Sequence, residues 1–126
     1  MEAPAFDTVS WFQIGTDDSE GARRFYGDLF GWKFTLDPDG DGYDLVSYPG
    51  DEGPSGGIAH GDGPTQNHAM FLVVVRDVQA ACEQAEKLGG KISLEPTGSP
   101  NGLVFAYLDD PSGNRFGVFT PPPAPA

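Results

Sequence analysis

Residues 11–32 read WFQIGTDDSEGARRFYGDLFGW, and this stretch predicts a strand that leads directly into an amphipathic helix. The segment from about Val9 to Gly15 has the composition of a strand with two different faces. Asp17 or Asp18 can then cap a helix, and Gly31 can end it by accepting a left-handed conformation. Between them the apolar residues fall on one helical face; they are Ala22, Phe25, Tyr26, Leu29 and Phe30.

The same pattern returns 59 residues later. This offset pairs Trp11 with Met70, Asp18 with Asp77 and Gly31 with Gly90. Each copy is read as a strand, a helix and three further strands, and internal repeats of this kind fix an architecture. We therefore predict an α+β fold of two βαβββ modules, the first at about residues 8–60 and the second at about 68–120. Together they form a single domain at 1–120, with a linker at 61–66 and a disordered proline-rich tail at 121–126.

Length, net charge and cysteine content indicate which partners and which cellular location to expect. The chain has 126 residues, enough for one domain, and a net charge of −12 from 7 basic and 19 acidic residues. Such a charge repels phosphate backbones, so we expect no nucleic-acid partner. The single cysteine, Cys82, cannot form an intrachain disulfide, and no apolar run reaches membrane-spanning length. We therefore expect a cytoplasmic protein with no membrane partner, and we expect Cys82 to be a buried, inert thiol on the second helix.

The order of several short motifs resembles the vicinal-oxygen-chelate superfamily, also called the glyoxalase/bleomycin-resistance/extradiol dioxygenase group. The matching pieces run from about Val9 to Phe119; they are Phe25-Tyr26, Leu29-Phe30-Gly31-Trp32, Asp77-Val78, Leu88-Gly89-Gly90 and Asp110-Pro111-Ser112-Gly113-Asn114-Arg115. The short, single-domain glyoxalase-like proteins are the most similar in outline. The resemblance implies that the two modules form a curved-sheet cup with helices outside. It also implies a homodimer.

Metal-dependent members of this superfamily place four ligands on inward strand positions of the cup. In this chain the resemblance puts Trp11, Met70 and Gly117 at three of these positions, and Gly56 or Gly57 near the fourth. Indole and glycine offer no side-chain lone pair to a divalent cation, and a thioether is a poor ligand for such metals. We therefore expect no metal and no other cofactor, which argues against glyoxalase I or dioxygenase activity in the usual metal-dependent form.

The cup lining is expected to combine apolar and aromatic side chains with a few polar groups. The candidate ligand-binding residues are Trp11, Gln13, Met70, Leu72, Tyr43, Phe105, Tyr107 and Arg115. Trp11 and Met70 can equally be core residues that fill the cup. The opposite strand faces, with Phe12, Ile14, Phe71, Val73 and Val75, are assigned to helix packing. The two histidines, His60 and His68, are interpreted as loop or strand-edge residues near solvent.

Three functions remain open at this stage. The first is a protein that binds a small, largely apolar or aromatic organic molecule without a metal. The second is an enzyme of the lyase or isomerase type that acts without a metal or with non-standard ligands, although no residue stands out as its base. The third is a regulatory module whose cup is filled by its own side chains. Whether the chain catalyses a reaction is therefore left open.

Overall fold

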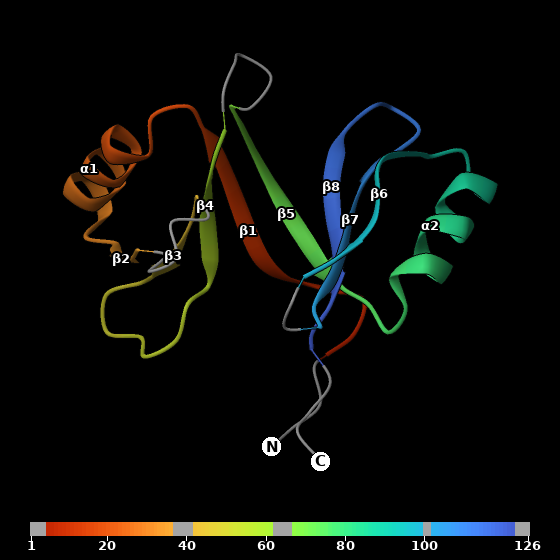
Figure 1. Cartoon of the computed structure of the whole chain (residues 1–126), viewed down its shortest axis with the longest axis horizontal. Coiled ribbons are helices and arrows are strands. Elements are labelled where there is room, and N and C mark those ends of the chain that lie inside the picture. The colour runs from red at the N-terminus through yellow and green to blue at the C-terminus, as the bar shows by residue number, and fades with distance from the viewer. Residues whose placement is uncertain (1–4, 37–41, 62–66, 100–101, 123–126) are drawn as a thin grey trace. The chain divides into compact units, whose positions relative to one another are not determined.

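The computed structural model describes residues 5–36, 42–61, 67–99 and 102–122. It forms two compact units, each a mixture of strands and one helix (Figure 1). The first unit is Trp11–Met70, and the second comprises the described residues up to Ser10 and from Phe71 onward. The predicted α+β class and the two βαβββ modules are confirmed. Most of the predicted linker and tail, and the middle of the predicted turn at 99–102, lie outside the described residues.

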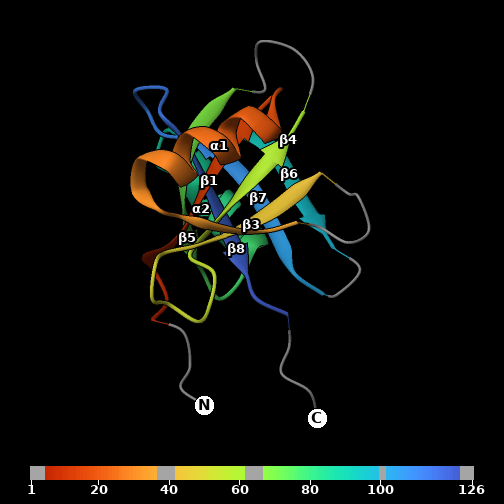
Figure 2. The ribbon, with the colours of Figure 1, turned by 90° about the vertical axis from the view of Figure 1, so that its left-hand side faces the viewer.

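The first βαβββ module contains β1 (Thr8–Thr16), α1 (Ser19–Phe30), β2 (Lys33–Thr35), β3 (Tyr43–Ser47) and β4 (Gly56–His60). Its strands lie in the order β2-β3-β4-β1. The β1–β4 pair is parallel, whereas β4–β3 and β3–β2 are antiparallel. Helix α1 lies over β4 on one face of these strands (Figure 2). The opposite face is therefore available for a site.

The second module repeats this arrangement with β5 (His68–Val74), α2 (Val78–Lys87), β6 (Lys91–Gly98), β7 (Val104–Asp109) and β8 (Arg115–Thr120). Its strands lie in the order β5-β8-β7-β6. The β5–β8 pair is parallel, and β8–β7 and β7–β6 are antiparallel. No helix among the described residues is long and apolar enough to cross a membrane.

Both helices begin at the aspartates that the sequence indicates. The Asp18 carboxylate accepts a hydrogen bond from the Gly21 amide at 2.9 Å, and that of Asp77 accepts one from the Ala80 amide at 3.1 Å. Each cap satisfies a backbone donor that has no partner within its helix. Gly31 ends α1 with φ at 75°, the left-handed conformation that glycine adopts without strain. The predicted starts of both helices and the predicted end of α1 are thereby confirmed.

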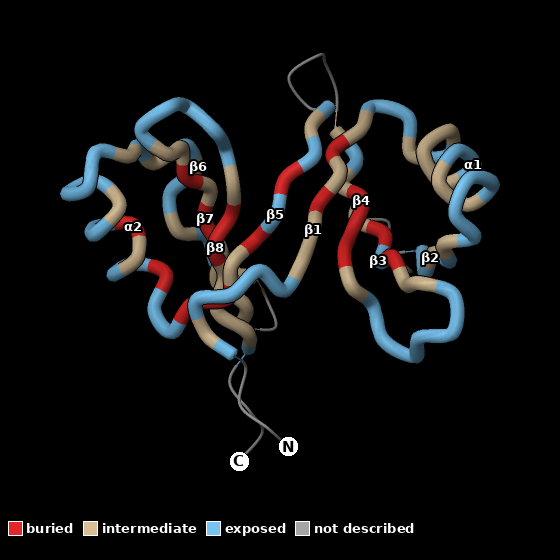
Figure 3. The backbone as a smooth tube through the Cα atoms, turned by 180° about the vertical axis from the view of Figure 1, so that it is seen from behind, coloured by how far each residue is buried: buried red, intermediate tan, exposed pale blue. Residues whose placement is uncertain are grey.

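The core of the second unit lies between α2 and its strands, which carry most of that unit's buried residues (Figure 3). Its buried members are Val75, Val78, Cys82, Ala106, Leu108 and Val118. Cys82 is fully buried, as predicted. Burial raises the pKa of this thiol, and the acidic side chains of Glu95, Glu86 and Glu83 raise it further.

In the first unit Val46 and Ile58 are fully buried, and a cluster of partly buried aromatic rings joins α1 to the strands. Trp32 stacks on Tyr26 with ring centroids 5.2 Å apart and lies 5.3 Å from Phe12. Beside this cluster Arg23 of α1 pairs with the buried carboxylate of Asp44 on β3 at 2.7 Å. The ion pair and the rings hold α1 on the strands.

Two packing predictions were wrong. Helix α1 has no buried residue, and Phe25, Leu29 and Phe30 of its predicted apolar face are exposed. The helix packs through Tyr26 of this face and through Arg23, so the apolar stripe is wider than the contact that it makes. Phe71 was assigned to helix packing but is 48% exposed, because its ring stacks on Phe116 rather than entering the buried core.

Candidate functional site

The strand face opposite α1 in the first unit carries four of the residues expected to line the site. The Arg23–Asp44 pair puts Asp44 on the helix side of β3, so its neighbour Tyr43 points to the other side. On β1, Phe12 packs with the helix-side rings, so Trp11 and Gln13 also lie on the opposite face. Met70, near the end of this unit, is buried.

Trp11 and Tyr43 form a hydrogen-bonded aromatic pair on this face. The indole Nε1–H donates to the Tyr43 hydroxyl oxygen at 2.8 Å. The Tyr43 ring lies directly over Gly57 of β4, where an added Cβ would be 2.2 Å from Cε1 and 2.4 Å from the hydroxyl oxygen. Any side chain at residue 57 would therefore displace the tyrosine. Gly57 is opposite Gln13 in the β1–β4 register, at the fourth-strand position considered for a metal ligand.

Gln13 and His68 form a polar pair on the same strands. The Gln13 Nε2 amide group lies 3.1 Å from Nε2 of His68, and Gln13 is only 4% exposed. Which of the two groups donates depends on the tautomer of the His68 ring. The neighbouring Asn67 side chain accepts a hydrogen bond from the Asp17 amide at 3.0 Å. Both contacts hold the start of β5 beside β1.

Sequence reasoning missed His68 as a member of this site. It had been interpreted as a residue near solvent, whereas it is half-buried and bonded to Gln13. The available signal was its position two residues before Met70 on one strand, which places both side chains on the same face. His60 is exposed, with its Nδ1 2.9 Å from the hydroxyl of Ser19 at the start of α1.

In the second unit, the face opposite α2 carries the other expected lining residues. Ala106 and Leu108 of β7 point into the α2 core, so Phe105 and Tyr107 point away from it, with ring centroids 5.9 Å apart. Leu72, Gly117 and Tyr107 lie side by side on neighbouring strands. The Leu72 side chain covers Gly117, where an added Cβ would be 2.7 Å from Leu72 Cγ.

Arg115 forms an ion pair with Asp109 where β7 and β8 meet the turn that connects them. Its Nε donates to Oδ1 of Asp109 at 2.8 Å, and its Nη2 donates to Oδ2 at 3.2 Å. The hydrogen bond from Arg115 holds the pKa of Asp109 below its ordinary value, and Asp109 raises the pKa of Arg115 in turn. In the adjoining turn, hydrogen bonds from Asn114 lower the pKa of Asp110. The role of Arg115 in ligand binding stays a prediction.

At the positions where the family resemblance implies metal ligands, the residues present do not fit a divalent cation. Trp11 donates its only polar hydrogen to Tyr43, and the tyrosine ring covers Gly57. Met70 offers a thioether, and Leu72 covers Gly117. Among the described residues, no group of three or more His, Cys, Asp or Glu side chains could hold a metal ion. The strand face of the first unit instead presents the aromatic surface of Trp11 and Tyr43 and the polar pair of Gln13 and His68.

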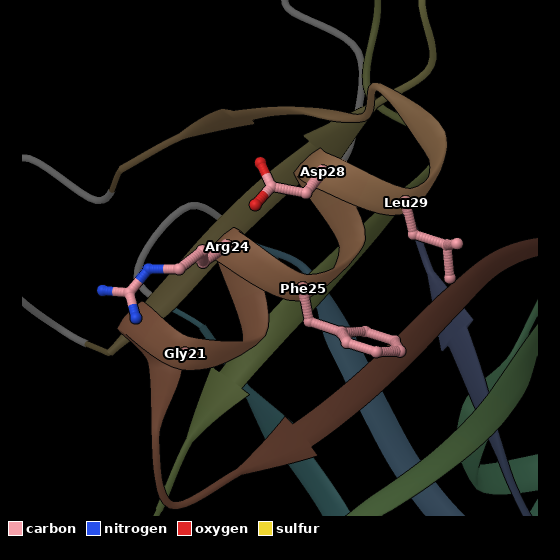
Figure 4. A pocket seen from close by; sticks show the side chains of 5 residues that line it. All are labelled: Gly21, Arg24, Phe25, Asp28 and Leu29. Carbon is pink, nitrogen blue, oxygen red and sulfur yellow. The ribbon is translucent and has the colours of Figure 1, made fainter.

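A depression of about 510 Å³ lies elsewhere, along the outer side of α1 (Figure 4). It is lined by Gly21, Arg24, Phe25, Asp28 and Leu29, all from this helix. None of these residues belongs to the predicted lining. The depression and the strand face are therefore separate features of the first unit.

Comparison with known proteins places the fold and the family. Residues 8–118 match the Glyoxalase/Bleomycin resistance protein/Dioxygenase superfamily. A "Glyoxylase-like domain-containing protein" of Didymella fabae is 32% identical over 90% of this chain and 94% of its own length. The "Anthracycline biosynthesis protein DnrV" of Streptomyces peucetius is 34% identical over 88% of this chain, but the matched region is only 40% of that protein.

Solved structures agree with this placement at the level of the fold. The methylmalonyl-CoA epimerase of Mycobacterium tuberculosis covers 97% of this chain with a TM-score of 0.63 and 15% sequence identity, and the match spans 94% of that structure. A superfamily member from Vibrio splendidus 12B01 covers 90% of the chain and matches over all of its own length, with a TM-score of 0.64 and 13% identity. The chain belongs to the Glyoxalase/Bleomycin resistance protein/Dioxygenase superfamily.

Proposed function

We propose that this protein binds a small, planar, largely aromatic molecule on the strand face that carries Trp11 and Tyr43, without the metal site of its family. One observation carries the proposal: the two rings are joined by a hydrogen bond, and the Tyr43 ring covers Gly57. A pair held in this way presents fixed aromatic surface, so little side-chain freedom is lost when a flat ligand stacks on it.

Gln13 and His68 supply the polar part of the proposed site. Binding sites for small molecules are usually apolar with a few placed polar groups that fix the orientation of the ligand. The amide and imidazole of this pair are 3.1 Å apart and lie on strands rather than on loops. A ligand with a hydroxyl or carbonyl at its edge would suit such a pair, because these groups can exchange hydrogen bonds with it.

The net charge of the chain and its similarity to one relative favour a cationic aromatic ligand. The net charge of −12 attracts cations over several ångströms of solvent. The relative from Streptomyces peucetius is named for anthracycline biosynthesis, and anthracyclines are planar aromatic compounds that can bear an amino sugar. The single cysteine, which is buried, suits a reducing compartment, and a cytoplasmic location is part of this proposal.

Titration with daunorubicin, followed by its fluorescence and by calorimetry, tests the proposal. We expect saturable binding to the wild type and a loss of at least about tenfold in affinity in Trp11→Ala, since tenfold corresponds to about 1.4 kcal/mol of lost stacking. Phe71→Ala removes a half-exposed ring from the helix-side face and should leave binding unchanged. No binding, or equal binding in both variants, would refute the site. Elemental analysis that finds stoichiometric metal would refute its metal-free part.

The position of His68 supports a second candidate, an enzyme that transfers a proton without a metal. The Gln13 amide contacts Nε2 and can orient the imidazole as a positioning residue does, so Nδ1 would have to be the atom that accepts the proton. The test is exchange of hydrogen for deuterium next to the carbonyl of 2-oxo compounds in heavy water, followed by NMR. Exchange that is lost in His68→Gln would favour this enzyme over a simple binding protein.

A further inference from the structure

The outer side of α1 has two flanks of opposite character, seen in Figure 4. Phe25 and Leu29 lie on one flank and are 59% and 57% exposed. Arg24 and Asp28 lie on the other flank, where Arg24 also contacts Glu20 at 3.4 Å. Gly21, without a side chain, lies between the flanks near the start of the helix. Two large apolar side chains this exposed on one helix face are unusual for a surface that meets only water.

The spacing of these residues makes the surface complementary to itself. Arg24 and Asp28 are one helical turn apart, and so are Phe25 and Leu29. When a second copy of α1 lies antiparallel across a twofold axis, each flank faces the same flank of the other copy. Arg24 then lies opposite the partner's Asp28, and Phe25 lies opposite the partner's Leu29. Both contacts occur twice, once on each side of the axis.

A parallel arrangement about a twofold axis would turn the flank with Arg24 and Asp28 toward the partner's flank with Phe25 and Leu29. Burying charged groups against apolar side chains opposes association, so the two flanks select the antiparallel arrangement. The charges also provide local attraction in a chain whose net charge of −12 otherwise repels a second copy. One helix face is small for an interface, so the complex should form at micromolar or higher concentrations.

We propose that α1 is a self-association surface and that its occupant is the α1 helix of a second copy of this chain, packed antiparallel. The contact does not involve Trp11, Tyr43, Gln13 or His68, so it is independent of the proposed ligand site. The family resemblance implies a homodimer, and the proposal places the interface of that dimer on Arg24, Phe25, Asp28 and Leu29.

Sedimentation velocity over concentrations from micromolar to near millimolar tests this surface. We expect Phe25→Asp to abolish the dimer and Arg24→Glu to weaken it at least about tenfold, because two symmetric attractions become repulsions. The double variant Arg24→Glu, Asp28→Arg restores opposite charges across the axis, so its dimer should return to within about threefold of wild type. All four side chains are exposed in the single chain, and circular dichroism will check that each variant folds.

Lys87→Glu in the last turn of α2 is the matched control. It changes the net charge by the same amount as Arg24→Glu and should leave the dimer unchanged. A protein that stays monomeric at every concentration overturns the proposal. So does a dimer that survives Phe25→Asp, since another surface would then hold it. A double variant that dimerises no better than Arg24→Glu alone excludes the antiparallel pairing.

Discussion

Replacing Gly57 by alanine tests whether the Tyr43 ring occupies the space above this glycine. The added methyl carbon would be 2.2 Å from Cε1 of Tyr43 and 2.4 Å from its hydroxyl oxygen. Both distances are too short for any non-bonded contact, so the ring must move. Moving it breaks the 2.8 Å hydrogen bond from Trp11. The substitution therefore disturbs packing and a polar contact at once.

The cost follows from three contributions. Forcing a methyl group into filled space costs about 1–3 kcal/mol, and losing the hydrogen bond costs about 0.5–1.5 kcal/mol. Against these, alanine in a strand gains about 0.5–1 kcal/mol over glycine because less backbone entropy is lost on folding. The expected net loss in the free energy of unfolding is about 2 kcal/mol. For a chain of this size that loss lowers Tm by roughly 8 °C.

Urea unfolding followed by circular dichroism measures this loss, and a double-mutant cycle assigns it to the ring. In a Tyr43→Ala background the space above residue 57 is open, so Gly57→Ala should cost nothing or stabilise slightly. Gly98→Ala is the matched control, since a methyl group added to this β6 glycine would have no heavy atom within 4 Å and should be neutral or stabilising. If Gly57→Ala is neutral in the wild type, or equally costly in both backgrounds, the reasoning fails.

Two further predictions concern charged groups. Asp44→Asn removes the charge opposite Arg23 while both side chains remain mostly buried. It should lower the free energy of unfolding, measured with urea, by about 1–3 kcal/mol. As a control, Asp51→Asn on the surface should change that free energy by less than about 0.5 kcal/mol. Arg115→Gln should raise the pKa of Asp109 toward its ordinary value, measured by carbon-13 NMR titration. Because the pKa of Asp109 is lowered in the folded state, its pairing with Arg115 stabilises the fold above the unfolded-state pKa. This stabilisation is lost as the pH falls through the folded-state pKa. The wild type and the variant should therefore have the same stability in acid.

The sequence was sufficient to predict the elements because their signals are local. Asp18, Asp77 and Gly31 act on the backbone within a few residues of themselves, and each has the predicted role. Alternation along β7 puts Phe105 and Tyr107 on one face and Ala106 and Leu108 on the other, and only the structure shows that the second pair faces the core. Helix α1 is different, because how much of an apolar stripe becomes buried depends on how the helix lies on the strands. Spacing alone did not reveal that Phe25 and Leu29 remain exposed.

The candidate site was predicted less completely, because its contacts join residues far apart in the chain. Strand periodicity places Trp11 and Gln13 on one face, but it cannot indicate which side chain of another strand each one meets. Tyr43 is 32 residues from Trp11, and His68 is 55 residues from Gln13. The histidine was assigned to solvent because no ligand-like spacing surrounds it. Its partner is an amide on a neighbouring strand, and that pairing follows from register.

The two glycines at the family's ligand positions have the same physical explanation. A metal ligand on a strand projects from the sheet, and replacing it with glycine would leave a hole that close packing does not tolerate. In the first unit Tyr43 fills the space above Gly57, and in the second unit Leu72 fills the space above Gly117. The covering side chain therefore limits the size of the residue that can stand at each glycine position. Placing a carboxylate at residue 57 alone would collide with Tyr43 before it could present oxygen to a cation, so a metal site on this face would need residues 43 and 57 to change together.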